Sequence, residues 1–170
     1  DQAMTQPPRI PRDWLQPQWP APAGVRALCT TRAGGVSPGP CASLNLGSHV
    51  GDDPSAVQAN RQRLQAVVQG ATPGARAVFL NQVHGTAVAT INPATPDGTE
   101  ADACVATQPG AVCTIMVADC LPVLLAHGSG AVVGAAHAGW RGLAGKGGVG
   151  VLEAVFERFK ALALSDKALA

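Results

Sequence analysis

The chain has 170 residues, and its twelve lysines and arginines nearly balance eleven acidic residues, for a formal net charge of +1. This length is enough for one hydrophobic core without disulfide support. The balanced charge argues against the basic surface that nucleic acids and anionic membranes require, and the 4% aromatic content, with no tyrosine, argues against base-stacking platforms. We therefore expect no nucleic-acid partner and no membrane partner.

The five cysteines form no CxxC pair. Their odd number argues against a secreted disulfide framework and indicates reduced thiols, so we expect a cytoplasmic protein. The longest apolar stretch, residues 111–126, is interrupted by Asp119 and Pro122, and the first residues do not follow the pattern of a signal peptide. These features predict neither export nor a membrane span.

The first half of the chain alternates loops with two regular elements. Residues 1–24 hold six prolines together with Trp14 and Trp19, which predicts an extended arm fixed by the two tryptophans. The apolar run 25–30 predicts a strand, and the segment TTRAGGVSPGP after it has too much glycine and proline for anything but a loop. An N-cap at Asp53, a proline at the first helical position, apolar residues at helical spacing and a closing glycine predict a helix over 53–70.

The second half reads as a sheet core followed by a helix. Short β-rich or small-apolar runs separated by Gly, Pro and Asp predict strands at residues 76–80, 86–91, 111–118, 121–126 and 131–136. Apolar residues recur at helical spacing over 152–162 with charged residues opposite, which predicts an amphipathic helix. The glycine-rich segment 145–150 lacks the Lys-Ser/Thr that a phosphate-binding loop needs, and we interpret it as a flexible lead-in to that helix.

Three segments place a reactive side chain at the end of an apolar run and beside a turn: NQVHG with His84, VADCLPV with Cys120 and AAHAGWRG with His137. Taken singly, a cysteine or histidine in such a run is more often a buried, hydrogen-bonded structural residue. Together, two imidazoles and one thiolate form a plausible zinc set that leaves a fourth position for water. The same atoms suit Cys-His nucleophilic catalysis, and their spacing does not separate the two interpretations.

The motifs TRAGGVSPGP, ASLNLG, LNQVHGTAV, ADA, VADCLPVLL and GAAHAGWRGLAG occur in the order seen in one family. From Val25 to Phe159 the chain resembles the YfiH-like family, also called the laccase-domain or multicopper polyphenol oxidase family, whose members are regarded as purine nucleoside phosphorylases. The resemblance implies an α/β fold with mixed β-sheets flanked by helices over residues 25–170. It also implies metal ligands at His84, Cys120 and His137, with zinc as the metal and copper as the less favoured alternative.

The family's activity implies phosphorolysis of adenosine, inosine and methylthioadenosine, and hydrolytic deamination of adenosine, with a small-molecule nucleoside and phosphate as partners. Under this hypothesis Asp119 transfers a proton or orients a ligand histidine. Arg32 and Arg141 hold phosphate through bidentate hydrogen bonds, and Asn45 meets ribose hydroxyls. Gln82, two residues before the first ligand, lines the same site.

The chain departs from the family pattern at Cys41, where an aromatic residue is expected, and in the extra glycines of LAGKGGVGVLEA. The family also continues past the final helix with a GPAIGPCCYEVG-like segment, so we expect the fold to be incomplete at its C-terminus. Three alternatives stay open. They are a Cys-His hydrolase or amidase that edits a cell-wall precursor with Cys120 as nucleophile, a structural zinc module, and a polyphenol oxidase, for which four histidines are too few ligands.

Overall fold

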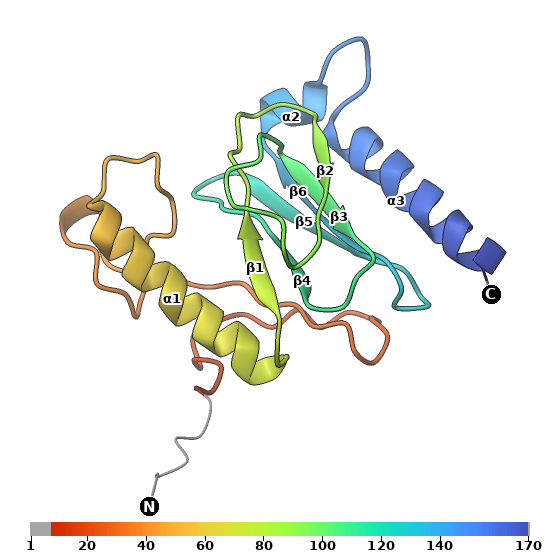
Figure 1. Ribbon diagram of the computed structural model, residues 1–170. Helices are drawn as coiled ribbons and strands as arrows, with labels where there is room; N and C mark the ends of the chain where they lie inside the picture. Colours follow the sequence, from red (N-terminus) through yellow and green to blue (C-terminus); the bar gives the residue numbers. More distant parts are fainter. Residues whose placement is uncertain (1–7, 170) are drawn as a thin grey trace, which may run out of the picture. The chain divides into compact units, whose positions relative to one another are not determined.

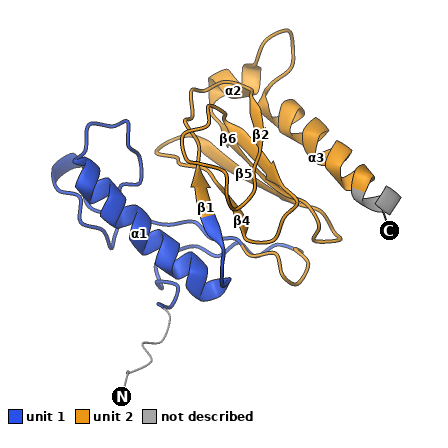
Figure 2. Cartoon of the chain, viewed as in Figure 1, with its two compact units in different colours: residues 1–19, 27–76 blue, residues 20–26, 77–170 orange. Residues whose placement is uncertain are grey.

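The computed structural model describes residues 8–169, with side chains up to residue 165. The first seven residues of the predicted arm lie outside the described residues. Contacts divide the chain into two compact units, residues 1–19 with 27–76 and residues 20–26 with 77–170 (Figure 2).

The first unit is organised around helix α1 (Pro54–Ala71) (Figure 1). The Asp53 carboxylate accepts a hydrogen bond from the Ser55 N–H, which satisfies one of the free donors of the first turn. Pro54 occupies the first helical position, where its missing N–H costs nothing. The helix predicted over 53–70 is therefore confirmed.

A buried asparagine of α1 holds the loop before the helix in place. The side chain of Asn60 is fully buried. Its Nδ2 donates to Ser37 Oγ at 2.9 Å, to the Ser43 carbonyl at 3.1 Å and to the Asn45 carbonyl at 2.8 Å, while its Oδ1 accepts from the Val36 N–H at 2.9 Å. The predicted glycine- and proline-rich loop is thus an ordered loop, with one short 3₁₀ turn, η1 (Gly39–Cys41).

The strand predicted over 25–30 is wrong. Within this run Cys29 forms an isolated antiparallel bridge with Leu15, and no named strand includes it. The boundary between the two units also falls within this run, between residues 26 and 27. An apolar run becomes a strand only when a partner follows it along its length, and here the pairing is limited to one residue. Trp14, next to this bridge, is buried and Trp19 is half-buried.

The second unit is built on a mixed four-stranded sheet in the order β2-β3-β6-β5 (Figure 1). Its strands are β2 (Val88–Thr90), β3 (Ala103–Ala106), β6 (Val133–Ala138) and β5 (Leu121–Ala126). Strands β2 and β3 run parallel, whereas β6 is antiparallel to both β3 and β5. A separate two-stranded sheet joins β1 (Arg76–Phe79) to β4 (Ala111–Thr114). The predicted α/β class with mixed sheets and helices is confirmed.

The central strand β3 is buried on both faces. Ala103 and Val105 belong to an apolar cluster with Val155 of helix α3 (Val151–Leu169), which confirms the predicted amphipathic helix. Cys104 and Ala106 belong to a second cluster on the other face. On the neighbouring strand β6 the same alternation directs residues 136 and 138 toward the α3 cluster, so residue 137 faces away from α3.

Two elements of this unit were not predicted. Strand β3 is only four residues long, and α2 (Trp140–Ala144) is a five-residue helix directly after β6.

No helix within residues 8–169 combines the length and the apolar character needed to cross a bilayer.

Candidate metal centre

The three predicted ligands come from separate segments of the second unit. His84 lies in the turn between β1 and β2, Cys120 directly precedes β5, and His137 lies on β6. The antiparallel register places Leu121 opposite Ala138, so the cysteine before β5 is aligned with the end of β6. Pairing of β5 with β6 therefore brings two of the three donors together, and the turn after β1 supplies the third.

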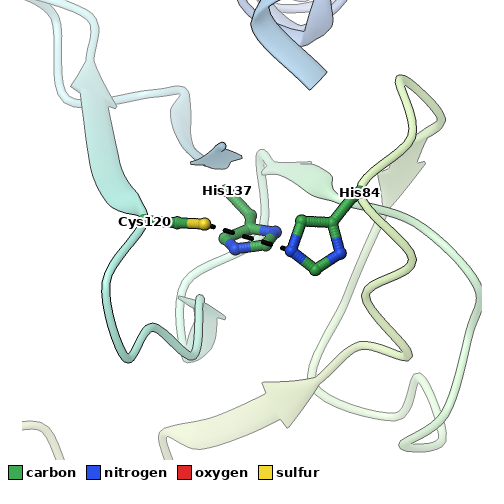
Figure 3. Close-up of side chains that lie close together, drawn as sticks. All are labelled: His84, Cys120 and His137. Carbon is green, nitrogen blue, oxygen red and sulfur yellow. Dashed lines mark hydrogen bonds between the residues drawn. The ribbon is translucent and has the colours of Figure 1, made fainter. Parts of the chain in front are cut away.

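The three side chains point toward one another (Figure 3). Their donor atoms all lie within 4.8 Å of one another, and Cys120 Sγ is 4.0 Å from His84 Nε2. The two imidazole rings meet edge to face, with centroids 4.8 Å apart. His137 is buried, Cys120 is half-buried and His84 is exposed, so the cluster has a buried inner side and an exposed outer side.

The donor set fits a transition metal ion. Two imidazole nitrogens and one thiolate sulfur suit zinc or copper, whereas magnesium and calcium prefer oxygen ligands. Three protein donors also leave one position of a tetrahedral site free, as in catalytic rather than structural zinc sites. The cluster is therefore a candidate metal centre formed by His84, Cys120 and His137.

The surroundings of the Cys120 thiol favour a role as metal ligand over a role as a nucleophile that acts without a metal ion. Partial burial and the nearby carboxylates of Asp119 and Asp102 raise the pKa of the Cys120 thiol. Protein groups alone therefore disfavour the thiolate that Cys-His catalysis requires. A bound cation reverses this balance, because its charge stabilises the thiolate directly.

A fourth residue, Asp102, belongs to this centre and was missed as a site residue. It is fully buried, one residue before β3. Its Oδ2 is 2.8 Å from His137 Nδ1 and 2.9 Å from the His84 N–H, and its Oδ1 accepts from the N–H groups of Val83 and Gly85 at 2.9 Å each. Burial raises the pKa of Asp102, but these hydrogen bonds outweigh it, so that the pKa lies below its ordinary value. The signal in the sequence is an acidic residue inside the small-apolar segment ADA.

The other predicted residues of this unit lie around the centre in different roles. The side-chain amide of Gln82 forms two hydrogen bonds with the backbone of Met116. Its Nε2 donates to the Met116 carbonyl at 2.7 Å, and its Oε1 accepts from the Met116 N–H at 2.8 Å. These bonds join the segment before His84 to the segment before Cys120. Asp119 is exposed, and its Oδ1 lies 3.7 Å from Cys120 Sγ; the carboxylate that contacts His137 is Asp102.

Arg141 is exposed on α2, and its guanidinium carbon lies 4.6 Å from the ring centroid of Trp140. Arg32 and Asn45 belong to the first unit. Arg32 donates from Nε to the Ala42 carbonyl and from Nη2 to the Pro40 carbonyl. The Asn45 amide donates to Asp52 and to the Gly47 carbonyl. The substrate-binding roles of these three residues stay predictions.

A His-Cys-His centre on a mixed sheet with flanking helices defines a candidate metalloprotein of the α/β class. The chain belongs to the family described as multi-copper polyphenol oxidoreductase laccase, whose family model matches residues 26–169. The predicted YfiH-like family is confirmed by its relatives, which include proteins of that name.

The chain is 53% identical over 144 residues to a purine nucleoside phosphorylase of Pseudomonas aeruginosa, covering 85% of this chain and 55% of the relative. It is 50% identical over 139 residues to the purine nucleoside phosphorylase YfiH of Escherichia coli, covering 82% and 54%. A crystal structure of a Neisseria meningitidis protein superposes with a TM-score of 0.74 at 48% identity, covering 88% of this chain and 58% of that one. The chain spans about half the length of the curated relatives it matches.

Proposed function

We propose that this chain carries the metal centre of a zinc-dependent purine nucleoside phosphorylase. The observation that supports this proposal is the meeting of His84, Cys120 and His137 in a chain whose relatives, at 53% and 50% identity, are named purine nucleoside phosphorylases. The substrates are adenosine, inosine and methylthioadenosine, together with inorganic phosphate. In the reaction a phosphate oxygen forms a bond to the ribose carbon while the bond from that carbon to the purine nitrogen breaks.

Zinc held by His84, Cys120 and His137 would supply positive charge to polarise a substrate oxygen or to lower the pKa of a water molecule. Asp119, exposed beside the cysteine ligand, transfers a proton to the leaving purine. Arg141, exposed on α2, provides a cation for phosphate. The reaction takes place in the cytoplasm, in keeping with five cysteines that are all free.

The proposal includes hydrolytic deamination of adenosine as a second activity. A centre with three protein donors leaves room for water, and deamination needs water as its nucleophile. Oxygen from water then replaces the amino group on the purine ring, and ammonia leaves.

The alternatives are less well supported. The raised pKa of Cys120 is unfavourable for a Cys-His hydrolase or amidase. Multicopper oxidation needs several copper sites, whereas the described part of the chain brings together donors for one metal ion.

The proposal is tested with the purified zinc-loaded protein, inosine and phosphate, by chromatography of the products. We expect hypoxanthine and ribose 1-phosphate in equal amounts, and no hypoxanthine when phosphate is left out. Cys120→Ala should abolish product formation, whereas Cys41→Ala, a change at a half-buried cysteine of the other unit, should not. Absence of base release from inosine, adenosine and methylthioadenosine, in protein with zinc bound at the cluster, would overturn the proposal.

A further inference from the structure

We infer that Asp102 is the positioning residue of the metal centre, because one buried carboxylate fixes both the ring of His137 and the backbone that carries His84. The inference rests on the metal centre of the proposed function. It does not depend on which reaction the centre catalyses.

The first step concerns the charge of Asp102. Its two oxygens face four groups, three of which are backbone N–H groups that can only donate. Oδ1 accepts from Val83 and Gly85, and Oδ2 accepts from His84 and lies 2.8 Å from His137 Nδ1. Three donated backbone hydrogen bonds stabilise the ionised carboxylate over the neutral acid, whose proton would fit only between Oδ2 and His137 Nδ1.

The second step concerns the tautomer of His137. An ionised carboxylate offers only acceptors, so Nδ1 of His137 must carry the hydrogen of the 2.8 Å contact. In a neutral imidazole this leaves Nε2 with a free lone pair, which is the form that binds metal. His137 is also fixed through its backbone, because its N–H donates to the Asp102 carbonyl at 2.7 Å.

The third step concerns His84. Its φ is +59°, in the left-handed region that residues other than glycine rarely adopt. The N–H groups of residues 83–85 all point at the one carboxylate of Asp102, an arrangement of successive N–H groups that forms an anion-binding concavity. The carboxylate therefore stabilises the turn conformation that aims His84 at the centre, and the same Oδ2 serves both ligands.

A carboxylate that only caps a turn would leave the His137 tautomer and the metal affinity unchanged when replaced by an isosteric amide. Asp102→Asn provides this test, since the amide must place its NH₂ group against N–H donors in either orientation. If the NH₂ group replaces Oδ2, His137 can satisfy it only by accepting at Nδ1, which moves the ring hydrogen to Nε2.

The experiment measures two quantities in native and Asp102→Asn protein. Long-range ¹H–¹⁵N correlation spectra of the metal-free protein report the tautomer of His137, and competition with a chromophoric chelator reports the zinc affinity. We expect the Nδ1–H tautomer in the native protein and the Nε2–H tautomer in the variant. The variant should bind zinc roughly 10- to 100-fold more weakly.

Two matched variants separate positioning from other effects. Val155→Ala removes buried apolar volume from the core of the same unit, and Asp53→Asn removes a carboxylate from a helix cap of the other unit. Both should keep the Nδ1–H tautomer of His137 and bind zinc within about threefold of the native affinity.

An Nε2–H tautomer in the native protein would overturn the inference, and this measurement needs no variant to fold. An Asp102→Asn protein with the native tautomer and native zinc affinity would overturn it as well. A native protein with the Nδ1–H tautomer but no zinc bound at the cluster would instead count against the proposed function. The hydrogen bond by which Asp102 orients His137 would still be supported.

Discussion

Gly139 lies directly against the sulfur of Cys120. A methyl group at position 139 would be 2.9 Å from Cys120 Sγ and 3.3 Å from His84 Cδ2. The backbone of Gly139 is extended, with φ −79° and ψ 167°, a conformation open to any residue. Glycine is therefore required here by the space that the two donors occupy, and not by the backbone.

We predict that Gly139→Ala weakens metal binding without unfolding the protein. The added methyl must displace the sulfur or the imidazole ring, and small displacements of ligands are costly in a centre with fixed geometry. We expect zinc affinity to fall about tenfold or more, measured by chelator competition, with an unchanged circular dichroism spectrum. Gly128→Ala is the matched control, because a methyl there meets nothing within 4 Å. Equal affinity in both variants would contradict the prediction.

The reactivity of Cys120 should depend on metal. A thiolate bound to zinc is shielded, so a maleimide should modify Cys120 slowly in zinc-loaded protein and faster after addition of a chelator. Peptide mapping by mass spectrometry gives the rate at each cysteine, and the half-buried Cys41 serves as an internal control whose rate stays constant. Equal rates at Cys120 with and without zinc would exclude it as a ligand and favour its role as a free nucleophile.

Asn60 should be the most sensitive position of the first unit. Its fully buried side chain makes four hydrogen bonds to the loop at residues 36–45, and Asn60→Ala removes all four, including the buried bond to Ser37 Oγ. We expect a loss of about 3 kcal/mol in the free energy of unfolding, measured by urea denaturation. Gln58→Ala, at an exposed position of the same helix, should change the free energy by less than about 0.5 kcal/mol. A loss at Asn60 no larger than at Gln58 would refute this account of the loop.

The sequence was informative where a signal is local. The α1 start is encoded by Asp53 and Pro54, two neighbours whose chemistry acts on the first helical turn. The strand β5 was predicted with its observed bounds, 121–126, because turn residues flank a continuous apolar run. The three candidate ligands were recognised because each stands at the end of such a run, within a motif shared with a known family.

The sequence was uninformative where a role depends on pairing between distant segments. Strand β3 is short and begins and ends with alanine, which has little intrinsic preference for strands, and it forms because both of its faces are covered by apolar clusters. Asp102 gains its role only when β3 pairs with β6 and brings it to His137. The space constraint at Gly139 likewise arises only when β5 and β6 align.

The first unit should also lose stability in acid through Asp52. Hydrogen bonds from Asn45 and Ser37 to the Asp52 carboxylate hold its pKa below the ordinary value. A carboxyl group whose pKa is lower in the folded state contributes stability above its unfolded pKa, about 4, and loses this contribution as the pH falls through the folded pKa. The free energy of unfolding should therefore decrease below about pH 4 more steeply in native protein than in Asp52→Asn.

Urea denaturation at a series of pH values between about 2 and 7 measures this difference. Asn45→Ala removes the donor with the largest effect on Asp52, so its pH profile should lie between those of native protein and Asp52→Asn. Parallel profiles for all three proteins would show that the Asp52 carboxylate has the same pKa in the folded and unfolded states. In that case its hydrogen bonds to Ser37 and Asn45 would favour the ionised form of Asp52 no more than the neutral form.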